Sequence, residues 1–460
     1  MSVKNFISTF TIIIAFSLYA MSTDAKEILG IKGEKHSSIG IYIKDLQADT
    51  VVFESEADKC LIPASITKSY TSATAMSLID SDFRFETKVY LTGAAGAQGE
   101  WNGDLIIKAS GDPTLESEYF KKTAGFLKEI VIALQDKGVR KINGDIILAR
   151  VDEMHDYPEG PLSTWPIGDV CWSYAAGAFD FNWCDNYFGI FPATGKTSSP
   201  VPGLKYTVWK NPWTKGLDMI RGVYSDSLII MGKQYATDPK ARVNTSMPYP
   251  FNTFREMLVN RLQANDIKIT LYPSGKTERT LLLTHKSVLI DEILRSLMVR
   301  SDNMFAESVL RMFGEHYGDR NEALDTQSKL WSSRGLQPEF NRIYDGSGLS
   351  RINNISPRYL GQVLEWMVKS EYRERYLGLF PVSGVSGTMK SFMADTPLKG
   401  RLAFKTGSVN SVQSYAGYVT DIKGNPTHVV VIMVNNFYCS RNELRLALKK
   451  LLLNKLEPWI

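Results

Sequence analysis

The sequence predicts an α/β protein of the α+β kind, in which an antiparallel sheet and a helical cluster form one domain and a β-rich module is inserted into it. Three observations predict this fold. Short β-rich runs separated by turns lie near both ends of the chain, helical patterns adjoin them, and the long middle segment has its own strand-like runs, each after a glycine. With 460 residues, 44% of them hydrophobic, the chain is long enough for two or three domains.

The first residues have the three parts of a secretory signal peptide. Lys4 provides the positive start, residues 10–18 the apolar core, and residues 23–25 a small-residue pattern that favours cleavage after Ala25. An uncleaved anchor helix is the alternative, but the apolar run is shorter than the roughly 20 residues of a bilayer span. No later stretch could span a membrane, and the first cysteine, Cys60, lies too far along to take a lipid. We therefore expect an exported protein, periplasmic or extracytoplasmic after cleavage, with no membrane span in its mature form.

Both ends of the remaining chain contribute to the predicted sheet. Residues 39–43 and 51–53 predict an opening hairpin, and residues 65–79, which lack Gly and Pro, predict a closely packed helix. Residues 401–406, 414–420 and 427–434 predict three more strands. Residues 442–455 predict a Leu-rich amphipathic helix that either covers one face of the sheet or docks on a membrane, the first being the commoner use.

The middle of the chain changes character at about residue 90. Strands are predicted at 104–108 and 145–149 and a helix at 118–137, whereas residues 165–190 show no clean period. Helical spacing returns at 289–313. We expect a signal peptide at 1–25, one domain from 26–89 and 275–460, and an inserted β-rich module at 90–274 with one or two subdomains.

Composition argues against several classes of function. The net charge of +4 comes from interspersed charges without a basic stripe, so no nucleic-acid partner is indicated. The five histidines are scattered without metal-ligand spacing, so no metal site is predicted. Of the four cysteines, Cys171 and Cys184 are closest in sequence, and either a disulfide or free thiols is compatible with this spacing.

Ser65 and Lys68 form the first candidate catalytic group. A spacing of three places both on one face of the predicted helix, so an amine lies beside a hydroxyl near a helix N-terminus, where developing negative charge is favoured. About two or three SxxK matches are expected by chance in a chain of this length, so the pair alone is weak evidence.

Two further motifs follow in order. Ser301-Asp302-Asn303 opens a helical run and, taken alone, is an ordinary helix cap. Lys405-Thr406-Gly407-Ser408 ends a predicted strand, where Gly allows close backbone approach and the other side chains offer donors for a carboxylate. The probability that a chain of this length contains both motifs by chance is on the order of a hundredth.

The ordered trio resembles the signature of the penicillin-recognising serine enzymes. The 232 residues between Lys68 and Ser301 are similar to the insertion of the class C low-molecular-mass penicillin-binding proteins, the D-alanyl-D-alanine carboxypeptidase/endopeptidase family. Residues 63–65, 110–115, 345–351 and 381–388 also resemble that family. Judged from their residue types alone, the Gly-rich stretches are turns, and no chemistry is assigned to them. Many relatives have Thr where this chain has Ser408.

The resemblance implies a penicillin-binding, serine β-lactamase-like transpeptidase domain and a serine carboxypeptidase that needs no cofactor. Its substrates would be peptidoglycan stem peptides, and β-lactam antibiotics would inhibit it. Ser65 would be the nucleophile, Lys68 its base, made neutral by burial and by Lys405, and Ser301 the proton donor to the leaving D-Ala. Asn303 would bind the substrate backbone, and the set Lys405, Thr406, Gly407 and Ser408 its terminal carboxylate. The backbone N–H groups of Ser65 and Ser408 would form the oxyanion hole.

Two alternatives remain open from the sequence. A β-lactamase would share the acylation step but hydrolyse its acyl-enzyme quickly, and the long insertion argues against it. A silent cell-wall-binding penicillin sensor would bind without turnover, and the intact motif residues argue against it. The balance between carboxypeptidase and endopeptidase action, the third residue of the stem peptide, the oligomeric state and the role of the insert do not follow from the sequence.

Overall fold

The computed structural model describes residues 27–149, 165, 177–209, 218–222, 225–232 and 238–456. The predicted signal peptide and Cys171, with its predicted pairing, lie outside the described residues. The chain divides into two compact units, residues 39–435 and a smaller unit that combines residues 1–38 with residues 436–460. In the smaller unit, helix α11 (Arg441–Leu456) confirms the predicted C-terminal helix, and its leucines 444, 448, 451 and 452 are buried. Whether this helix covers one face of the sheet, as its leucines predict, stays a prediction.

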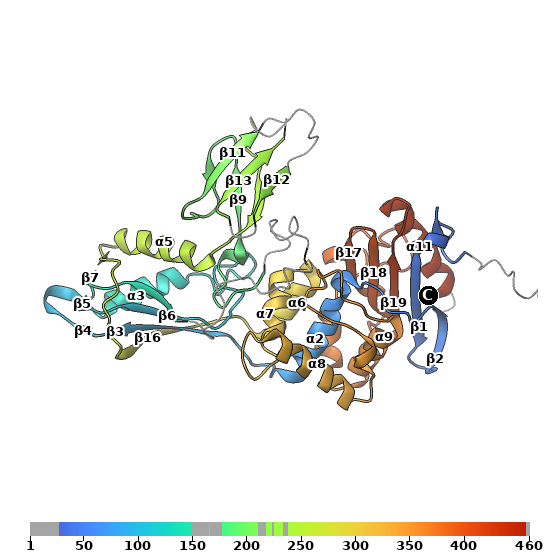
Figure 1. Ribbon diagram of the computed structural model, residues 1–460. Coiled ribbons are helices and arrows are strands. Elements are labelled where there is room, and N and C mark those ends of the chain that lie inside the picture. Colours follow the sequence, from blue (N-terminus) through green and yellow to red (C-terminus); the bar gives the residue numbers. More distant parts are fainter. Residues whose placement is uncertain are drawn as a thin grey trace, which may run out of the picture. The chain divides into compact units, whose positions relative to one another are not determined.

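A five-stranded sheet joins the two ends of the chain, in the order β17-β18-β19-β1-β2 (Figure 1). Its strands are β1 (Ser38–Asp45), β2 (Thr50–Ser55), β17 (Leu402–Val409), β18 (Val412–Thr420) and β19 (Pro426–Asn435). The pairs β1–β2, β17–β18 and β18–β19 are antiparallel, which confirms the predicted hairpin and the three predicted C-terminal strands. Every residue of β18 is buried, as expected of a central strand covered on both faces.

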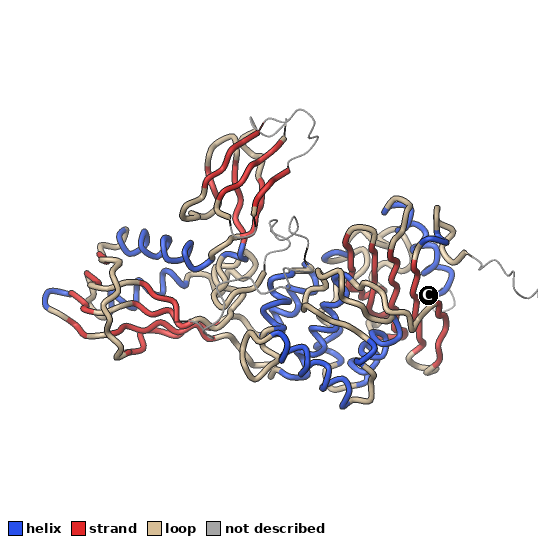
Figure 2. The backbone as a smooth tube through the Cα atoms, viewed as in Figure 1, coloured by secondary structure: helices blue, strands red, loops and turns tan. Residues whose placement is uncertain are grey.

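Helices pack in the same part of the structure, and Figure 2 shows them as a cluster of blue tubes beside the red strands of this sheet. They are α2 (Thr67–Leu78), α6 (Ile290–Arg300), α7 (Asn303–Leu310), α8 (Arg320–Ser333), α9 (Pro357–Lys369) and α10 (Arg373–Leu377). Residues 67–76 of α2 are all buried, because its Ser, Thr and Ala side chains let neighbouring helices approach closely. The predicted helical stretch 289–313 is two helices, since Ser301 adopts a left-handed conformation (φ 63°) that ends α6. No helix among the described residues is both long and apolar enough to cross a membrane.

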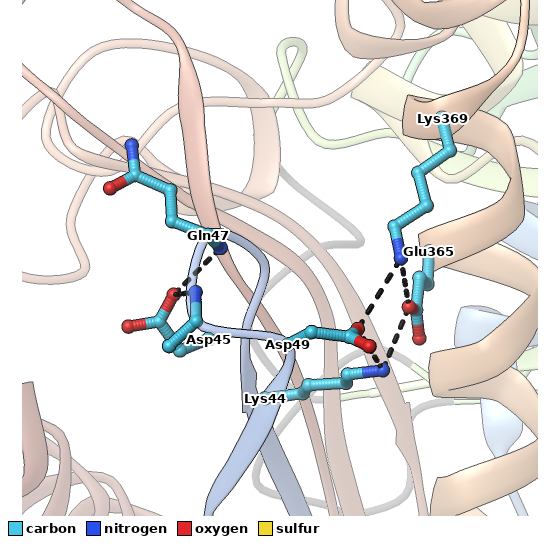
Figure 3. Close-up of polar contacts among 7 residues, drawn as sticks. Lys44, Asp45, Gln47, Asp49, Glu365 and Lys369 are labelled. Carbon is cyan, nitrogen blue, oxygen red and sulfur yellow. Dashed lines mark hydrogen bonds and ion pairs between the residues drawn. The ribbon is translucent and has the colours of Figure 1, made fainter.

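Four charged side chains link the β1–β2 hairpin to α9 (Figure 3). The Nζ atom of Lys44 lies 2.8 Å from both Asp49 Oδ1 and Glu365 Oε1. Lys369 Nζ contacts the same two carboxylates at 3.4 and 2.6 Å. Burial lowers the pKa of Lys44, but its hydrogen bonds to Asp49 and Glu365 outweigh burial and raise that pKa to about 12. Each cation thus bridges the hairpin and the helix.

The long middle segment builds a second hydrophobic core, distinct from that of the helical cluster. Its sheets have the orders β16-β3-β6-β8, β15-β7-β5-β4, β10-β9-β14 and β11-β13-β12. The strands are β3 (Glu86–Thr92), β4 (Ala94–Ala95), β5 (Glu100–Asn102), β6 (Leu105–Lys108), β7 (Lys141–Ile142), β8 (Ile146–Ala149), β9 (Tyr187–Phe191), β10 (Lys196–Thr197), β11 (Lys205–Trp209), β12 (Asp218–Arg221), β13 (Ser227–Met231), β14 (Val243–Ser246), β15 (Lys268–Ile269) and β16 (Arg279–Lys286). Two helices, α3 (Phe126–Asp136) and α5 (Pro250–Gln263), pack in this core.

The prediction of a helix over 118–137 is wrong in its first eight residues. Helix α3 begins at Phe126, directly after Gly125 in a positive-φ conformation (121°). The preceding stretch turns instead, because the carboxylates of Asp185 and Glu116 accept hydrogen bonds from the backbone N–H groups of Glu118 at 3.0 Å and Gly125 at 2.8 Å. Cys60, Cys184 and Cys439 have free thiols.

Candidate active site

Ser65 lies in a 3-10 turn, η2 (Ala64–Ile66), that leads directly into α2. Its half-buried hydroxyl accepts a hydrogen bond from Lys68 Nζ at 3.0 Å, which is the pairing that the SxxK spacing predicts. The residue before it, Ala64, has a positive φ of 51°, a conformation that L-residues adopt only when their surroundings hold them there. Gly348 provides that hold by close approach, since a Cβ on it would lie 2.0 Å from the Ala64 carbonyl oxygen.

Lys68 is fully buried and donates two more hydrogen bonds. Asn303 Oδ1 accepts one at 2.7 Å, and the Ser347 backbone carbonyl accepts the other at 2.6 Å. Burial lowers the pKa of Lys68 to about 8, against the opposing charges of Asp345, Glu307 and Asp302. Burial therefore lowers the pKa of Lys68, as the sequence predicted.

The second motif connects α6 to α7. Asp302 is the N-cap of α7 and accepts a hydrogen bond from the Phe305 backbone N–H at 3.1 Å, so the helix-cap interpretation of the triplet is also correct. The sharp turn at Ser301 presents its hydroxyl to Lys405, whose Nζ donates to it at 2.8 Å. Asn303, one residue into α7, bonds Lys68 as described. The cap thus positions Ser301 and Asn303 beside different lysines.

The third motif lies on β17. Lys405 is fully buried, and burial together with the nearby Lys68 lowers its pKa well below the usual value. The sequence predicted that the charge of Lys405 would lower the pKa of Lys68. In the structure it is the charge of Lys68 that lowers the pKa of Lys405. Thr406 Oγ1 donates to Thr388 Oγ1 at 2.9 Å, whereas Ser408 is exposed. Gly407 is required, because a Cβ there would lie 2.5 Å from the Pro63 carbonyl oxygen and push β17 away from η2.

The Gly-rich loop 345–351 was predicted only as a turn, yet its Ser347 carbonyl holds Lys68. The Asp345 carboxylate accepts hydrogen bonds from the backbone N–H groups of Gly348 at 2.7 Å and Ser350 at 2.6 Å. Glu307, on α7, accepts from the Ser347 N–H at 2.8 Å. Burial and the neighbouring Asp345 raise the pKa of Glu307 to about 8. In the sequence, Glu307 shows only as a Glu within the apolar run after Asn303, which does not by itself indicate this role.

These contacts set the chemistry that the site can perform. An amine that is partly neutral near pH 8 lies beside a hydroxyl that it can deprotonate, and a second amine lies beside a second hydroxyl. Within the described ranges, no group of three or more His, Cys, Asp or Glu side chains is placed to hold a metal ion.

The sequence is similar to known proteins along most of its length. The sequence profile of the D-Ala-D-Ala carboxypeptidase 3 (S13) family matches residues 26–176 and 220–452. The chain is 24% identical over 458 residues to the D-alanyl-D-alanine carboxypeptidase DacB of Haemophilus influenzae, covering 92% of this chain and 91% of that protein. It is also 24% identical to a D-alanyl-D-alanine carboxypeptidase of Actinomadura sp., over 85% of this chain and 77% of that protein.

Solved structures have the same fold. The crystal structure of penicillin binding protein 4 from Haemophilus influenzae matches with a TM-score of 0.78 and 23% identity, covering 92% of this chain and 97% of that chain. A structure of that protein complexed with a β-lactam matches with a TM-score of 0.71 and 22% identity, over 91% and 96% of the two chains.

Proposed function

From the premise that the chain belongs to the D-Ala-D-Ala carboxypeptidase 3 (S13) family and is a serine-type D-Ala-D-Ala carboxypeptidase, we propose that Ser65 forms its acyl-enzyme. One observation carries this assignment: the buried Lys68 amine lies 3.0 Å from the Ser65 hydroxyl, with a pKa lowered to about 8. A base must be neutral to accept a proton, and burial makes the neutral amine accessible near physiological pH.

In the first half-reaction, Ser65 Oγ attacks the carbonyl carbon of the D-Ala–D-Ala amide and its proton passes to Lys68 Nζ. The backbone N–H groups of Ser65 and Ser408 stabilise the oxyanion. The C–N bond then breaks as Ser301 passes its proton to the leaving amine, and Ser301 regains a proton from the protonated Lys68, which restores the neutral amine. Asn303 orients the substrate backbone by hydrogen bonding.

The terminal carboxylate of the substrate binds at Lys405, Thr406, Gly407 and Ser408. A bound carboxylate favours the protonated form of Lys405, which burial otherwise disfavours. In the second half-reaction, water attacks the Ser65 ester, and Lys68 takes the proton of that water. With a β-lactam, the leaving amine stays tethered to the acyl group, so the acyl-enzyme persists.

We further propose that the substrates are peptidoglycan stem peptides and that the enzyme is exported, with cleavage after Ala25 placing it in the periplasm or outside the cytoplasm. The catalytic domain consists of residues 26–89 and 275–460, and residues 90–274 form the insert. Two separate hydrophobic cores support this division. Strand β3 runs across the first boundary, and its partner β16 begins at residue 279, shortly after the second.

Mass spectrometry of the purified mature protein with benzylpenicillin tests the proposal. We expect a lasting adduct that maps to Ser65, absent from Ser65→Ala and retained in Ser77→Ala, a serine of the same helix away from the site. Release of D-Ala from a pentapeptide should be lost in Ser65→Ala and retained in Ser77→Ala. Unchanged D-Ala release by Ser65→Ala would overturn the assignment, and rapid loss of the adduct with product release would indicate a β-lactamase.

A further inference from the structure

Trp165, a residue of the insert, contacts the loop that holds Lys68 and takes no part in the mechanism above. Its indole N–H donates a hydrogen bond to Asp345 Oδ2, with Nε1 2.8 Å from that oxygen. Trp165 is only 3% exposed, so it presents almost no surface to a substrate. The indole can therefore affect the reaction only through the residues that it contacts.

The fully buried Asp345 carboxylate accepts four hydrogen bonds, two on each oxygen. Oδ1 accepts from the Gly348 backbone N–H at 2.7 Å and from Asn353 Nδ2 at 2.8 Å. Oδ2 accepts from the Ser350 backbone N–H at 2.6 Å and from the Trp165 indole. A carboxylate has about four positions for donors, so these four fill it. Three of the donors fold the loop on itself, whereas the fourth ties the loop to the insert.

The same loop carries the carbonyl that orients the reacting amine. Ser347, two positions after Asp345, accepts a hydrogen bond from Lys68 Nζ on its backbone carbonyl at 2.6 Å. Between them, the Gly346 carbonyl accepts a hydrogen bond from Thr71 Oγ1 of α2 at 2.7 Å. Because only two planar peptide units separate these positions, a shift of the Asp345 carboxylate moves the Ser347 carbonyl as well. The carbonyl is thus fixed from α2 on one side and from the insert on the other.

We infer that Trp165 is a positioning residue for Lys68, and that the insert supports acylation through this indole N–H. The inference rests on the proposed function, in which Lys68 takes the proton of Ser65. With the indole in place, Asp345 holds the loop so that the Ser347 carbonyl directs the amine toward the Ser65 hydroxyl. Without it, a buried acceptor position on Asp345 has no donor, and the loop is held less firmly.

The charges around Lys68 give a second effect of the same bond. Asp345, Glu307 and Asp302 favour the protonated amine, whereas burial favours the neutral one. The buried Lys405 is a further charged group beside this amine. An indole N–H directed at the Asp345 carboxylate offsets part of its negative charge. Removal of that N–H should therefore favour the protonated amine and move the rise of acylation to higher pH.

Trp165→Phe in the full-length mature enzyme tests the inference, because it keeps an apolar ring and removes the N–H. At saturating benzylpenicillin and pH 7, the acylation rate constant should fall on the order of tenfold, with the half-saturating concentration unchanged. The pH at which this rate levels off should increase. Benzothienylalanine at position 165, which has the size of Trp but sulfur in place of the N–H, should give the same losses and tests the inference even if Trp165→Phe does not fold. Trp183→Phe is the matched control, because Trp183 is a fully buried Trp of the insert whose indole donates to Met257 Sδ at 3.4 Å, and it should leave the rate unchanged.

Asp345→Asn shows whether Trp165 acts through Asp345. An amide has one acceptor oxygen in place of two, so Asp345→Asn should itself slow acylation, and adding Trp165→Phe should slow it little further. Fully additive losses in the double variant would overturn the inference. Equal rates in Trp165→Phe and Trp183→Phe, or a change confined to the half-saturating concentration, would overturn it as well. All of these outcomes leave the proposed function intact, whereas turnover by Ser65→Ala would overturn that function itself.

Discussion

The protonation state of Lys68 decides when Ser65 can react. Only the neutral amine can accept the Ser65 proton, and burial lowers its pKa to about 8 although Asp345, Glu307 and Asp302 oppose this. The neutral fraction therefore increases with pH. We expect the rate constant of acylation by benzylpenicillin to rise on the order of tenfold per pH unit below pH 7 and to level off above pH 9. Rapid-quench mass spectrometry measures this rate, and a flat profile between pH 6 and pH 9 would contradict the role of Lys68.

Glu307 is a positioning residue, because it accepts a hydrogen bond from the N–H of Ser347, the residue whose carbonyl accepts one from Lys68. Its pKa, raised to about 8, leaves it largely protonated at pH 7. Glu307→Gln should therefore retain most acylation at pH 7 and depart from wild type only above pH 8, where the native carboxyl ionises. Glu307→Ala leaves the Ser347 N–H buried without an acceptor, which costs about 1–3 kcal/mol, and should slow acylation at every pH. Equal acylation by all three proteins would exclude this role.

The site residues that the sequence predicted are those with a motif spacing, and the ones it missed act through tertiary contacts. Ser65 and Lys68 are three residues apart on one helix, so their contact follows from local geometry. Asp345 and Glu307 show their role only when the loop and α7 pack around Lys68. A Gly-rich turn and a helical Glu are too common in sequences to indicate such a contact.

At the scale of elements, the strands of the five-stranded sheet were predicted because turn residues bound each β-rich run, whereas only β6 and β8 of the insert's strands were predicted. The helix predicted at 118–137 failed in its first eight residues, where the side chains of Asp185 and Glu116 accept hydrogen bonds from backbone N–H groups that a helix would use. The break between α6 and α7 was indicated by Ser301-Asp302-Asn303, whose residue types favour caps. Local competition by short polar side chains thus explains both the failure and the success.

The link between the β1–β2 hairpin and α9 predicts a stability effect. Glu365→Gln removes the carboxylate shared by Lys44 and Lys369, of which Lys44 is only 15% exposed. We expect a loss of about 0.5–1.5 kcal/mol in the free energy of unfolding, measured with urea, and a smaller loss at high salt. Asp325→Asn is the control, because its pair with Lys329 on α8 is largely exposed, and it should change stability less. Equal losses in the two variants would show that burial of the link has no effect.

The molecule has two separate hydrophobic cores. A substitution in the core of the insert can therefore lower the free energy of unfolding without abolishing acylation of Ser65. Phe254 is fully buried in the core of the insert, with ring centroids 4.9 Å from Phe181 and 5.0 Å from Trp183. Phe254→Ala should lower the free energy of unfolding by about 3–5 kcal/mol, whereas the same change at the exposed Phe340 should have little effect.

Because no atom of the insert takes part in the proposed attack on a small β-lactam, folded Phe254→Ala should still form the benzylpenicillin adduct on Ser65. Urea unfolding and adduct mass, recorded on the same sample, separate the two effects. Loss of the adduct in protein that is still folded would mean that the core of the insert supports acylation itself, and the two cores would then have to be regarded as one catalytic structure.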